Sequence, residues 1–442
     1  MKSSLQLVSR ILQRKSHRDD IPEPSWQTST KSCTSVDAAL TSFDGHPALV
    51  ELRMLTTAAE RFGIGNPFFK MHEGAGGSVT QINGKEYLNF SHYNYLGLNG
   101  HPEVNKAVKE AVERYGTSAG ASRLVAGERP VQRALEKALA DVYGVDDCVV
   151  FVSGHATNVS TISTLFGPGD LILHDSLIHN SVLEGIRLSR AARRPFPHND
   201  LNALDTLLAA SRTQYKRTLI VAEGLYSMDG DLPDLPALVD IKRRHGAFLM
   251  LDEAHSLGVL GATGRGLVEY YGVSGKDVDI WMGTLSKTLA GCGGYIAGSQ
   301  ALVDILKFAA PGFVYSVGLA PPLAAASLAA LRIMLREPER VQRLRERGAL
   351  FLDLARREGL DVGTSQGLAI IPIIVGSSHK AIALSNRLFD QCINVQPIIH
   401  PAVEEKSARL RFFLSTMHSE SDIRHVCRTL ARLVHGKDIT DD

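Results

Sequence analysis

Short apolar runs alternate with longer amphipathic stretches through the middle of the chain, between residues 131 and 297. The run Thr218–Ala222 has the length of a buried strand, whereas Leu235–His245 and Val131–Tyr143 repeat apolar residues at helical spacing. This alternation predicts an α/β fold with a mostly parallel sheet. We predict its strands at Cys148–Val152, Leu171–His174, Thr218–Ala222, Ala247–Leu251, Asp279–Met282 and Gly294–Ala297.

The pattern differs toward both ends of the chain. Helical spacing near Pro47–Phe62 precedes a β segment at Val79–Phe90, in which Asn83-Gly84 predicts a hairpin turn. Toward the C-terminus, two long helical stretches precede an apolar strand at Ala369–Val375, a further helix and a final strand at Leu410–Leu414. This order is typical of a smaller α+β domain.

The chain has 442 residues, of which 44% are hydrophobic, and this is enough for a large core and two domains. We predict a tail and linker over residues 1–48 and an N-terminal segment over 49–98 that packs with the small domain. The large domain, which would bind the ligand, is predicted over 99–320 and the small C-terminal domain over 321–442.

The formal net charge of +1 gives no general reason to expect nucleic acid or an anionic membrane as a partner. The five cysteines form no CxxC pair, which favours reduced thiols and a cytoplasmic location. No apolar stretch has the length of a membrane span, so we expect no integral membrane segment.

The first eighteen residues contain basic side chains and no acid, with apolar residues at helical spacing. This pattern is shared by mitochondrial-type presequences, by small helices that dock on a partner and by partly helical, solvated tails. We prefer the last interpretation, because short amphipathic stretches often arise by chance.

Lys287 is the first candidate catalytic residue. It lies in the segment Gly283–Thr288, which follows a predicted strand. A second strand ends in Asp252-Glu253-Ala254-His255. A lysine amine held near an aspartate and a histidine suits a reaction in which the amine captures a carbonyl group. Pyridoxal 5′-phosphate (PLP) requires such a set: a lysine for the Schiff base, an acid beside the pyridine nitrogen and donors for the phosphate.

Other polar clusters also fall where predicted strands end, at Ser153–Asn158, His179-Asn180-Ser181 and Glu223–Gly230. In open α/β sheets ligands bind at the carboxyl ends of the strands, so these clusters predict one composite site. Backbone N–H groups near Gly154 could hold an anion at a helix start.

Some of these residues have a second interpretation. Asp252 could instead cap a helix, and His255 could be a buried structural histidine, although the other motifs favour the site. Thr284 could contact a phosphate, orient the lysine or cap the next segment. His179 could stack on a ligand ring or lie in a surface loop, and the sequence does not decide between these.

Arg409 and Arg411 alternate with apolar residues on the last predicted strand, so both point to the same face. An arginine there could hold a substrate carboxylate by two hydrogen bonds. Without further information the pattern favours an exposed pair on the solvent face of an edge strand.

From about Arg53 to Arg432 the chain resembles the α-oxoamine synthase family of fold-type I PLP enzymes. That family includes serine palmitoyltransferase, 8-amino-7-oxononanoate synthase, 2-amino-3-ketobutyrate CoA ligase and 5-aminolevulinate synthase. The resemblance rests on Tyr93–Leu98, Gly120–Leu124, Ser153–Asn158, His179–Ser181, Glu223–Asp231, Asp252–Ser256, Gly283–Lys287 and Ala408–Arg411. It implies a large domain with a mostly parallel central sheet and a smaller α+β C-terminal domain.

The resemblance implies a catalytic set of Lys287, His179, Asp252 and His255. Lys287 would carry the Schiff base and return as a base. Asp252 would pair with the pyridine nitrogen, His179 would stack on the ring, and His255 would lie near the phenolate oxygen with Ser227.

The resemblance also implies binding residues and no metal site. The cofactor would be held by Ser153, Gly154, His155, His179, Glu223, Ser227, Asp252, His255, Thr284, Lys287 and Ser316. Ser316 would reach the phosphate across a dimer interface. Asn94 and Arg411 would bind substrate, with Arg411 on the amino-acid carboxylate, and this reverses the preference drawn from the strand pattern alone.

The reaction implied by the resemblance is that of an acyltransferase of the EC 2.3.1 type. A small amino acid (glycine, alanine or serine) condenses with an acyl thioester, presented by coenzyme A or an acyl carrier protein. The products are an α-amino ketone, carbon dioxide and free thiol, and the enzyme would be a homodimer with a shared active site. The alternatives are a non-catalytic partner subunit of such a synthase and another fold-type I PLP enzyme.

The chain departs from the family pattern in three places, of which the altered loops at 315–318 and 399–406 could change substrate choice, whereas the contact at His155 is expected through the backbone. His155 replaces an aromatic residue, Val317 and Gly318 replace hydrogen-bonding residues, and the loop 399–406 lacks the usual Pro-Thr-Val-Pro stretch. The sequence leaves open which amino acid, which acyl chain and which carrier are used, and what residues 1–48 do.

Overall fold

The computed structural model describes residues 38–61 and 65–436, and the chain divides into two units, residues 1–64 and 65–442. In the first unit two short 3-10 turns, Ala38–Thr41 and Phe43–Gly45, precede helix α2, Pro47–Arg61. This helix confirms the helical spacing predicted near Pro47–Phe62. The basic segment of the first eighteen residues, and the linker before residue 38, lie outside the described residues.

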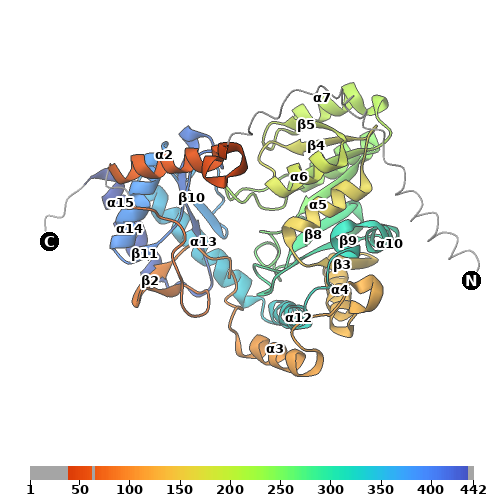
Figure 1. Cartoon of the computed structure of the whole chain (residues 1–442), viewed down its shortest axis with the longest axis horizontal. Coiled ribbons are helices and arrows are strands. Elements are labelled where there is room, and N and C mark those ends of the chain that lie inside the picture. The colour runs from red at the N-terminus through yellow and green to blue at the C-terminus, as the bar shows by residue number, and fades with distance from the viewer. Residues whose placement is uncertain (1–37, 62–64, 437–442) are drawn as a thin grey trace, which may run out of the picture. The chain divides into compact units, whose positions relative to one another are not determined.

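The second unit is built on a seven-stranded sheet with the order β3-β9-β8-β7-β6-β4-β5 (Figure 1). Only β9 is antiparallel to its two neighbours, and the other pairs are parallel. The strands are β3 (Asp147–Phe151), β4 (Leu171–Asp175), β5 (Ala192–Phe196), β6 (Thr218–Glu223), β7 (Phe248–Asp252), β8 (Ile280–Thr284) and β9 (Gly294–Gly298). The mostly parallel sheet predicted from the apolar runs is confirmed.

Both faces of this sheet are buried, because successive side chains of a strand point to opposite faces. In β7, Leu249 and Leu251 belong to one apolar core and Met250 belongs to the other. Ile162 of α5 and Val182 of α6 pack in the core that contains Met250. The helices that accompany the sheet are α3 (Pro102–Tyr115), α4 (Pro130–Tyr143), α5 (Gly154–Leu165), α6 (Asn180–Ser189), α7 (Leu201–Ser211), α8 (Leu235–His245), α9 (Leu267–Tyr271), α10 (Gln300–Ala309), α11 (Pro311–Val314) and α12 (Pro321–Arg336).

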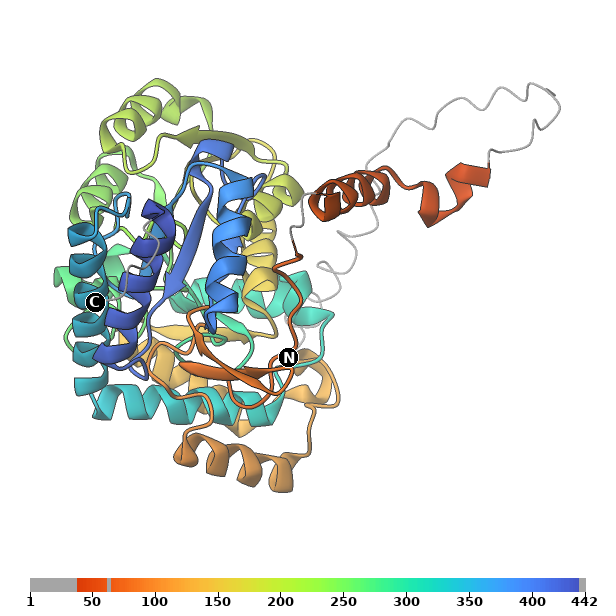
Figure 2. The ribbon, with the colours of Figure 1, turned by 90° about the vertical axis from the view of Figure 1, so that its left-hand side faces the viewer.

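Two three-stranded sheets complete the unit. In the first, the predicted hairpin of β1 (Val79–Ile82) and β2 (Lys85–Asn89) is extended by β11 (Ile393–Asn394), which joins the N-terminal segment to the C-terminal part. The second has the order β10-β13-β12 and faces the viewer in Figure 2, coloured blue. Its strands and the last helices are β10 (Ile370–Ile374), β12 (Pro397–Ile398), β13 (Arg409–Phe413), α13 (Glu339–Arg357), α14 (Ser378–Asp390) and α15 (Glu420–His435).

Two features differ from the sequence pattern. Strand β5 was not predicted, because its sequence Ala192-Arg-Arg-Pro-Phe196 is polar and mostly exposed, as an edge strand can be. Strand β13 lies in the centre of its sheet, so the interpretation of Arg409 and Arg411 as an exposed pair on an edge strand is wrong. The domain boundary at 320/321 stays a prediction.

Within the described ranges no helix is long and apolar enough to cross a membrane. The same residues contain no group of three or more histidine, cysteine, aspartate or glutamate side chains arranged to hold a metal ion.

Candidate active site

A cavity of about 350 Å³ lies at the carboxyl ends of the parallel strands of the large sheet. It is lined by residues that follow β3, β4, β6, β7 and β8, and by Arg411 of β13. Most of the residues predicted from the sequence meet here: Ser153, Gly154, His155, His179, Glu223, Ser227, Asp252, His255, Thr284, Lys287 and Arg411. Asn94 lines an adjoining smaller cavity, and Ser316 lines neither.

Lys287 lies in the turn that follows β8, and its side chain is half-buried. Its Nζ atom is 2.8 Å from Nε2 of His255 and 5.4 Å from the centre of the Tyr93 ring. Burial lowers the pKa of Lys287 to about 8, even though Asp252 and Glu223 act in the opposite direction. The amine is therefore partly neutral near pH 8, as a lysine that attacks a carbonyl group must be.

His255 connects Lys287 to Tyr95, for which the sequence predicts no role. Nδ1 of His255 is 2.7 Å from the hydroxyl oxygen of Tyr95, which is fully buried. Burial, with the positive charge of Lys287 as a smaller cause, lowers the pKa of His255 well below its ordinary value. A neutral imidazole has one N–H and one acceptor nitrogen, so it can link the hydroxyl group to the amine.

Asp252 ends strand β7 with its carboxylate in the cavity. Nδ2 of Asn158 donates to Oδ2 of Asp252 at 2.9 Å, and the backbone N–H of Ala254 donates to Oδ1 at 3.0 Å. Asn158 also contacts Ser181 at 2.9 Å, which links α5, α6 and β7. The sequence predicts no role for Asn158, although it belongs to the motif Ser153–Asn158. Its position near the start of α5, close after Gly154, is the signal that could have identified it.

Glu223 lies beside Asp252, because the two residues pair across strands β6 and β7. Burial, and then the negative charge of Asp252, raises the pKa of Glu223 to about 8. The protonated form of Glu223 is therefore favoured at neutral pH. Oε2 of Glu223 accepts a hydrogen bond from the backbone N–H of Ser227 at 3.1 Å.

The start of α5 offers an anion-binding end to the cavity. Ser153 caps this helix, and its hydroxyl oxygen accepts from the backbone N–H of Ala156. A Cβ atom at Gly154 would lie 3.1 Å from Oγ1 of Thr284, so a larger residue would crowd this wall. Thr284 donates to the carbonyl oxygen of Gly293 at 3.0 Å and fixes the loop that carries Lys287. Helix N-termini bind phosphate through their free N–H groups and their dipole.

His179 is the cap of helix α6 and is exposed at the mouth of the cavity. Its Nδ1 atom is 2.7 Å from the hydroxyl oxygen of Ser181. This bond orients the imidazole and connects His179, through Ser181, to Asn158 and Asp252.

The two arginines of β13 share a face but differ in their partners. Arg409 donates to the Asp229 carboxylate at 2.6 Å. Arg411 donates to the carbonyl oxygen of Ser227 at 3.0 Å, and no ion pair joins it to a carboxylate in the described part of the chain. Its buried Nε atom has no hydrogen-bond partner. A guanidinium with an unmet donor in a cavity is suited to a carboxylate ligand.

The donor set fits PLP. Besides Nε of Arg411, two other buried polar atoms of the cavity walls have no partner within residues 38–61 and 65–436: Oδ1 of Asn158 and Oε1 of Glu223. Buried polar groups are nearly always hydrogen-bonded, so unpartnered atoms around one cavity indicate a polar ligand. The cavity combines an amine, a carboxylate and a helix N-terminus, which match the aldehyde, the pyridine nitrogen and the phosphate of this cofactor.

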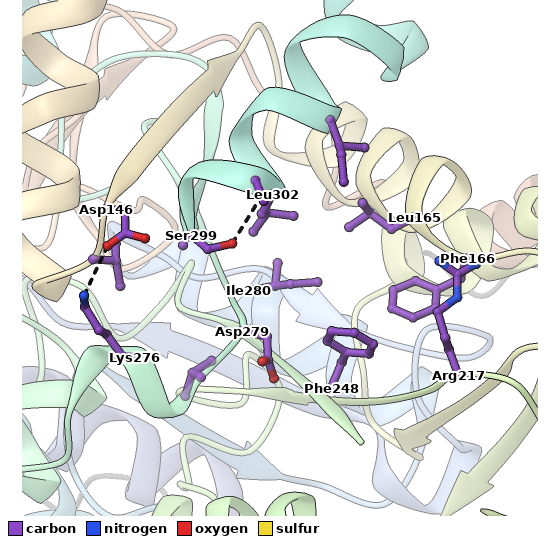
Figure 3. Close-up of a pocket in the computed structure, with 15 residues that line it drawn as sticks. Asp146, Leu165, Phe166, Arg217, Phe248, Lys276, Asp279, Ile280, Ser299 and Leu302 are labelled. Carbon is purple, nitrogen blue, oxygen red and sulfur yellow. Dashed lines mark hydrogen bonds and ion pairs between the residues drawn. The ribbon is translucent and has the colours of Figure 1, made fainter. Parts of the chain in front are cut away.

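A second cavity of about 350 Å³ lies at the opposite ends of the strands and has a different character (Figure 3). Apolar side chains such as Phe248, Ile280 and Leu302 form its walls. Of its charged residues, Lys276 is paired with Asp146 at 3.2 Å, and Arg217 is paired with Asp170 at 2.7 Å. Its lysine is held in an ion pair and most of its wall is apolar, so we place no chemistry there.

Comparison with known proteins agrees with this geometry. The chain matches the family model of aminotransferase class I and II over residues 85–430. It is 43% identical over 368 residues to an 8-amino-7-oxononanoate synthase of Geobacter sulfurreducens, covering 83% of this chain and 93% of that protein. An 8-amino-7-oxononanoate synthase of Symbiobacterium thermophilum is 39% identical over 352 residues, covering 80% of this chain and 89% of the relative.

A solved structure of a variant of serine palmitoyltransferase from S. paucimobilis, with a bound PLP–myriocin aldimine, superposes with a TM-score of 0.84. The two sequences are 28% identical, and the match covers 87% of this chain and 97% of that one. The fold and the cofactor predicted from the sequence are thus both found in a protein of similar structure.

Proposed function

The chain belongs to the aminotransferase class I and II family and, within it, to the α-oxoamine synthases, and on this premise we propose a role for each residue of its cavity. The enzyme is a PLP-dependent acyltransferase that condenses an amino acid with an acyl thioester and releases carbon dioxide. When bound, PLP supplies the electron sink for this chemistry.

Lys287 would attach the cofactor and afterwards move the substrate proton. The 2.8 Å contact between Nζ of Lys287 and Nε2 of His255 carries the proposal, because it holds the amine in the cavity that also contains Asp252. Tyr95 fixes the imidazole from its other side. Asp252, held by Asn158, would keep a negative charge beside the pyridine nitrogen.

The remaining residues would bind and orient. The N-terminus of α5, with Ser153, Gly154, His155 and Thr284, would hold the phosphate. His179 would cover the ring, and His255 would lie near the phenolate oxygen with Ser227. Glu223, protonated at neutral pH, would hold the Ser227 backbone. Arg411 would bind the amino-acid carboxylate, since its Nε donor is unmet.

We propose alanine as the amino acid. The relatives at 43% and 39% identity are named for a product with an amino group on carbon 8 and a keto group on carbon 7 of a nine-carbon acid. A condensation of this class would take the amino-bearing carbon and its methyl neighbour from alanine. Glycine would leave no such methyl group, and serine would leave a hydroxymethyl group.

The test is thiol release by purified protein supplied with PLP and acyl-CoA, with glycine, alanine or serine in turn. We expect release with alanine to be fastest, accompanied by carbon dioxide from its carboxyl group. Equal thiol release without any amino acid would show a thioesterase instead. Activity with serine alone would keep the reaction and reject alanine.

A homodimer in the cytoplasm is also proposed. Ser316 does not line the cavity of its own chain, so a phosphate contact from this residue requires a second copy. Sedimentation of an active species with the mass of one chain would reject this part of the proposal.

A further inference from the structure

A smaller cavity of about 150 Å³ adjoins the cofactor cavity, and Lys287, Tyr93 and Ser286 line both. Its other walls come from the loop at Gly76, from His92, Asn94 and Asn99, and from Ala290 and Gly291. Apart from Lys287 it contains no side chain with a formal charge, whereas the cofactor cavity contains Arg411 and Asp252. The smaller cavity therefore suits an uncharged polar group.

Asn94 fixes the walls of this cavity through its side-chain amide. Its Nδ2 donates to the carbonyl oxygen of Gly76 at 2.9 Å, and its Oδ1 accepts from the backbone N–H of Asn99 at 3.0 Å. These bonds fix two walls and use the polar atoms of the amide. A direct contact between Asn94 and substrate stays a prediction.

His92 is one of the residues that line this cavity, and one of its two ring nitrogens is without a partner among the described residues. The backbone N–H of Asn94 donates to Nδ1 of His92 at 3.1 Å, so Nδ1 is the acceptor of the ring and the proton of the neutral imidazole lies on Nε2. Nε2 is buried, and none of the residues that the structure describes forms a hydrogen bond with it. Burial, with the neighbouring His418 as a smaller cause, lowers the pKa of His92 to about 3, so the ring is neutral at physiological pH.

We propose that His92 is a catalytic residue whose Nε2–H donates a hydrogen bond to the carbonyl oxygen of the acyl thioester in this smaller cavity. The inference rests on the proposed function and adds a subsite for its second substrate. The amino acid occupies the cofactor cavity with its carboxylate at Arg411. The thioester must reach the same carbon near Lys287, and the adjoining cavity provides an uncharged position for its carbonyl group.

The chemistry needs a donor at this position and no proton transfer from it. As the new carbon–carbon bond forms, the carbonyl π electrons move to the thioester oxygen, which becomes negative. The pair on oxygen re-forms the carbonyl as the carbon–sulfur bond breaks. The thiolate leaves with the electron pair of the carbon–sulfur bond and is protonated by solvent. His92 keeps its proton throughout, and a fixed neutral donor stabilises such an oxyanion.

Two half-reactions separate this function from a structural one. Exchange of the α-proton of alanine with D2O, followed by NMR, needs PLP, Lys287 and Arg411 but no thioester. Thiol release with alanine and acyl-CoA needs both subsites. We would assay octanoyl-CoA, palmitoyl-CoA and the CoA thioester of a seven-carbon dicarboxylic acid, which is what remains of the nine-carbon product without the two carbons from alanine. The later assays use the thioester that the unmodified enzyme turns over fastest.

His92→Leu removes the donor, and His92→Gln places an amide N–H near the position of Nε2. We expect His92→Leu to slow thiol release on the order of a hundred-fold in kcat, while α-proton exchange changes less than about two-fold. His92→Gln should recover at least about ten-fold of this loss, since an amide can donate the same bond. His425→Leu, at an exposed histidine of α15, is the matched control and should behave like the unmodified enzyme.

Equal losses in both half-reactions would show that His92 only supports the fold, and unchanged thiol release in His92→Leu would also overturn the inference. If the unmodified enzyme shows neither α-proton exchange nor thiol release, the proposed function itself fails and the subsite with it. Exchange that persists while only thiol release falls would support both.

Discussion

The two large cavities of the sheet have similar volumes and lie at opposite ends of the same strands, but they differ in chemistry. At the carboxyl ends, buried polar atoms of Asn158, Glu223 and Arg411 lack partners. None of the unpartnered buried side-chain atoms of the described residues lines the cavity at the amino ends. The candidate active site is therefore distinguished from the other cavity by its unpartnered hydrogen-bonding atoms and not by its volume.

The difference follows from the direction of the elements. Every parallel strand delivers its following loop to the same edge of the sheet, and α5 begins there with free N–H groups. At the other edge, charged residues such as Lys276 pair with their neighbours and apolar side chains fill the wall. A single strand, β7, thus carries Asp252 at one end and Phe248 at the other.

The largest effect short of removing the lysine is expected at Asp252. Asp252→Asn would take the negative charge from the pyridine nitrogen, and we expect α-proton exchange to slow by about 2–4 kcal/mol in activation free energy. The measurement is α-proton exchange with saturating alanine, with cofactor content determined in the same sample. Exchange at the normal rate in a fully loaded variant would contradict the role of Asp252.

The two arginines of β13 allow a matched pair of substitutions. Arg411→Leu should weaken amino-acid binding by about 2 kcal/mol, roughly a thirty-fold rise in KM, because a charged hydrogen bond is lost. Arg409→Leu should instead lower the free energy of unfolding by about 3 kcal/mol, because Asp229 loses its partner. Steady-state kinetics and denaturant titration of both variants check this. A rise in KM for Arg409→Leu together with a loss of stability for Arg411→Leu would contradict the separate roles of the two arginines.

The pH dependence of cofactor capture is expected to be smaller. Burial disfavours the charged ammonium of Lys287, so its pKa falls to about 8 and the reactive neutral amine increases as the pH rises through that value. The capture rate of PLP by cofactor-free protein should rise about ten-fold from pH 7 to a plateau above pH 9. Absorbance after rapid mixing measures it, and a midpoint near 10.5 would show an ordinary lysine.

The smallest effect is predicted at the amino end of β7. Phe248→Ser should leave kcat and KM within about two-fold and change the free energy of unfolding by about 1 kcal/mol, since the side chain is partly exposed and touches Phe166. The same assays apply to this variant. A loss of activity comparable to that of Asp252→Asn would mean that the apolar cavity takes part in the reaction.

Much of the fold follows from local sequence. Apolar runs located six strands of the large sheet, and the carboxyl ends of its parallel strands placed Lys287, Asp252 and Glu223 in one site. Strand β5 was missed because its exposed arginines hide the period of a strand. Its pairing with β4 comes from tertiary structure and not from local preference.

The contacts that the sequence could not supply join distant positions. Tyr95 and His255 are 160 residues apart and meet at 2.7 Å, and Asn158 reaches Asp252 over 94 residues. The sequence predicts two arginines on one face of β13. Only the structure shows that Arg409 pairs with Asp229, whereas Arg411 has no carboxylate partner in the described part of the chain.

The central claim is that Lys287 holds the cofactor. The direct measurement is reduction of the PLP-loaded protein with borohydride, followed by mass spectrometry of its peptides, with Lys287→Ala treated in parallel. We predict a covalently attached pyridoxyl group on the peptide that contains Lys287, and neither label nor thiol release in the variant. A label on another lysine, or turnover by Lys287→Ala, would contradict the account.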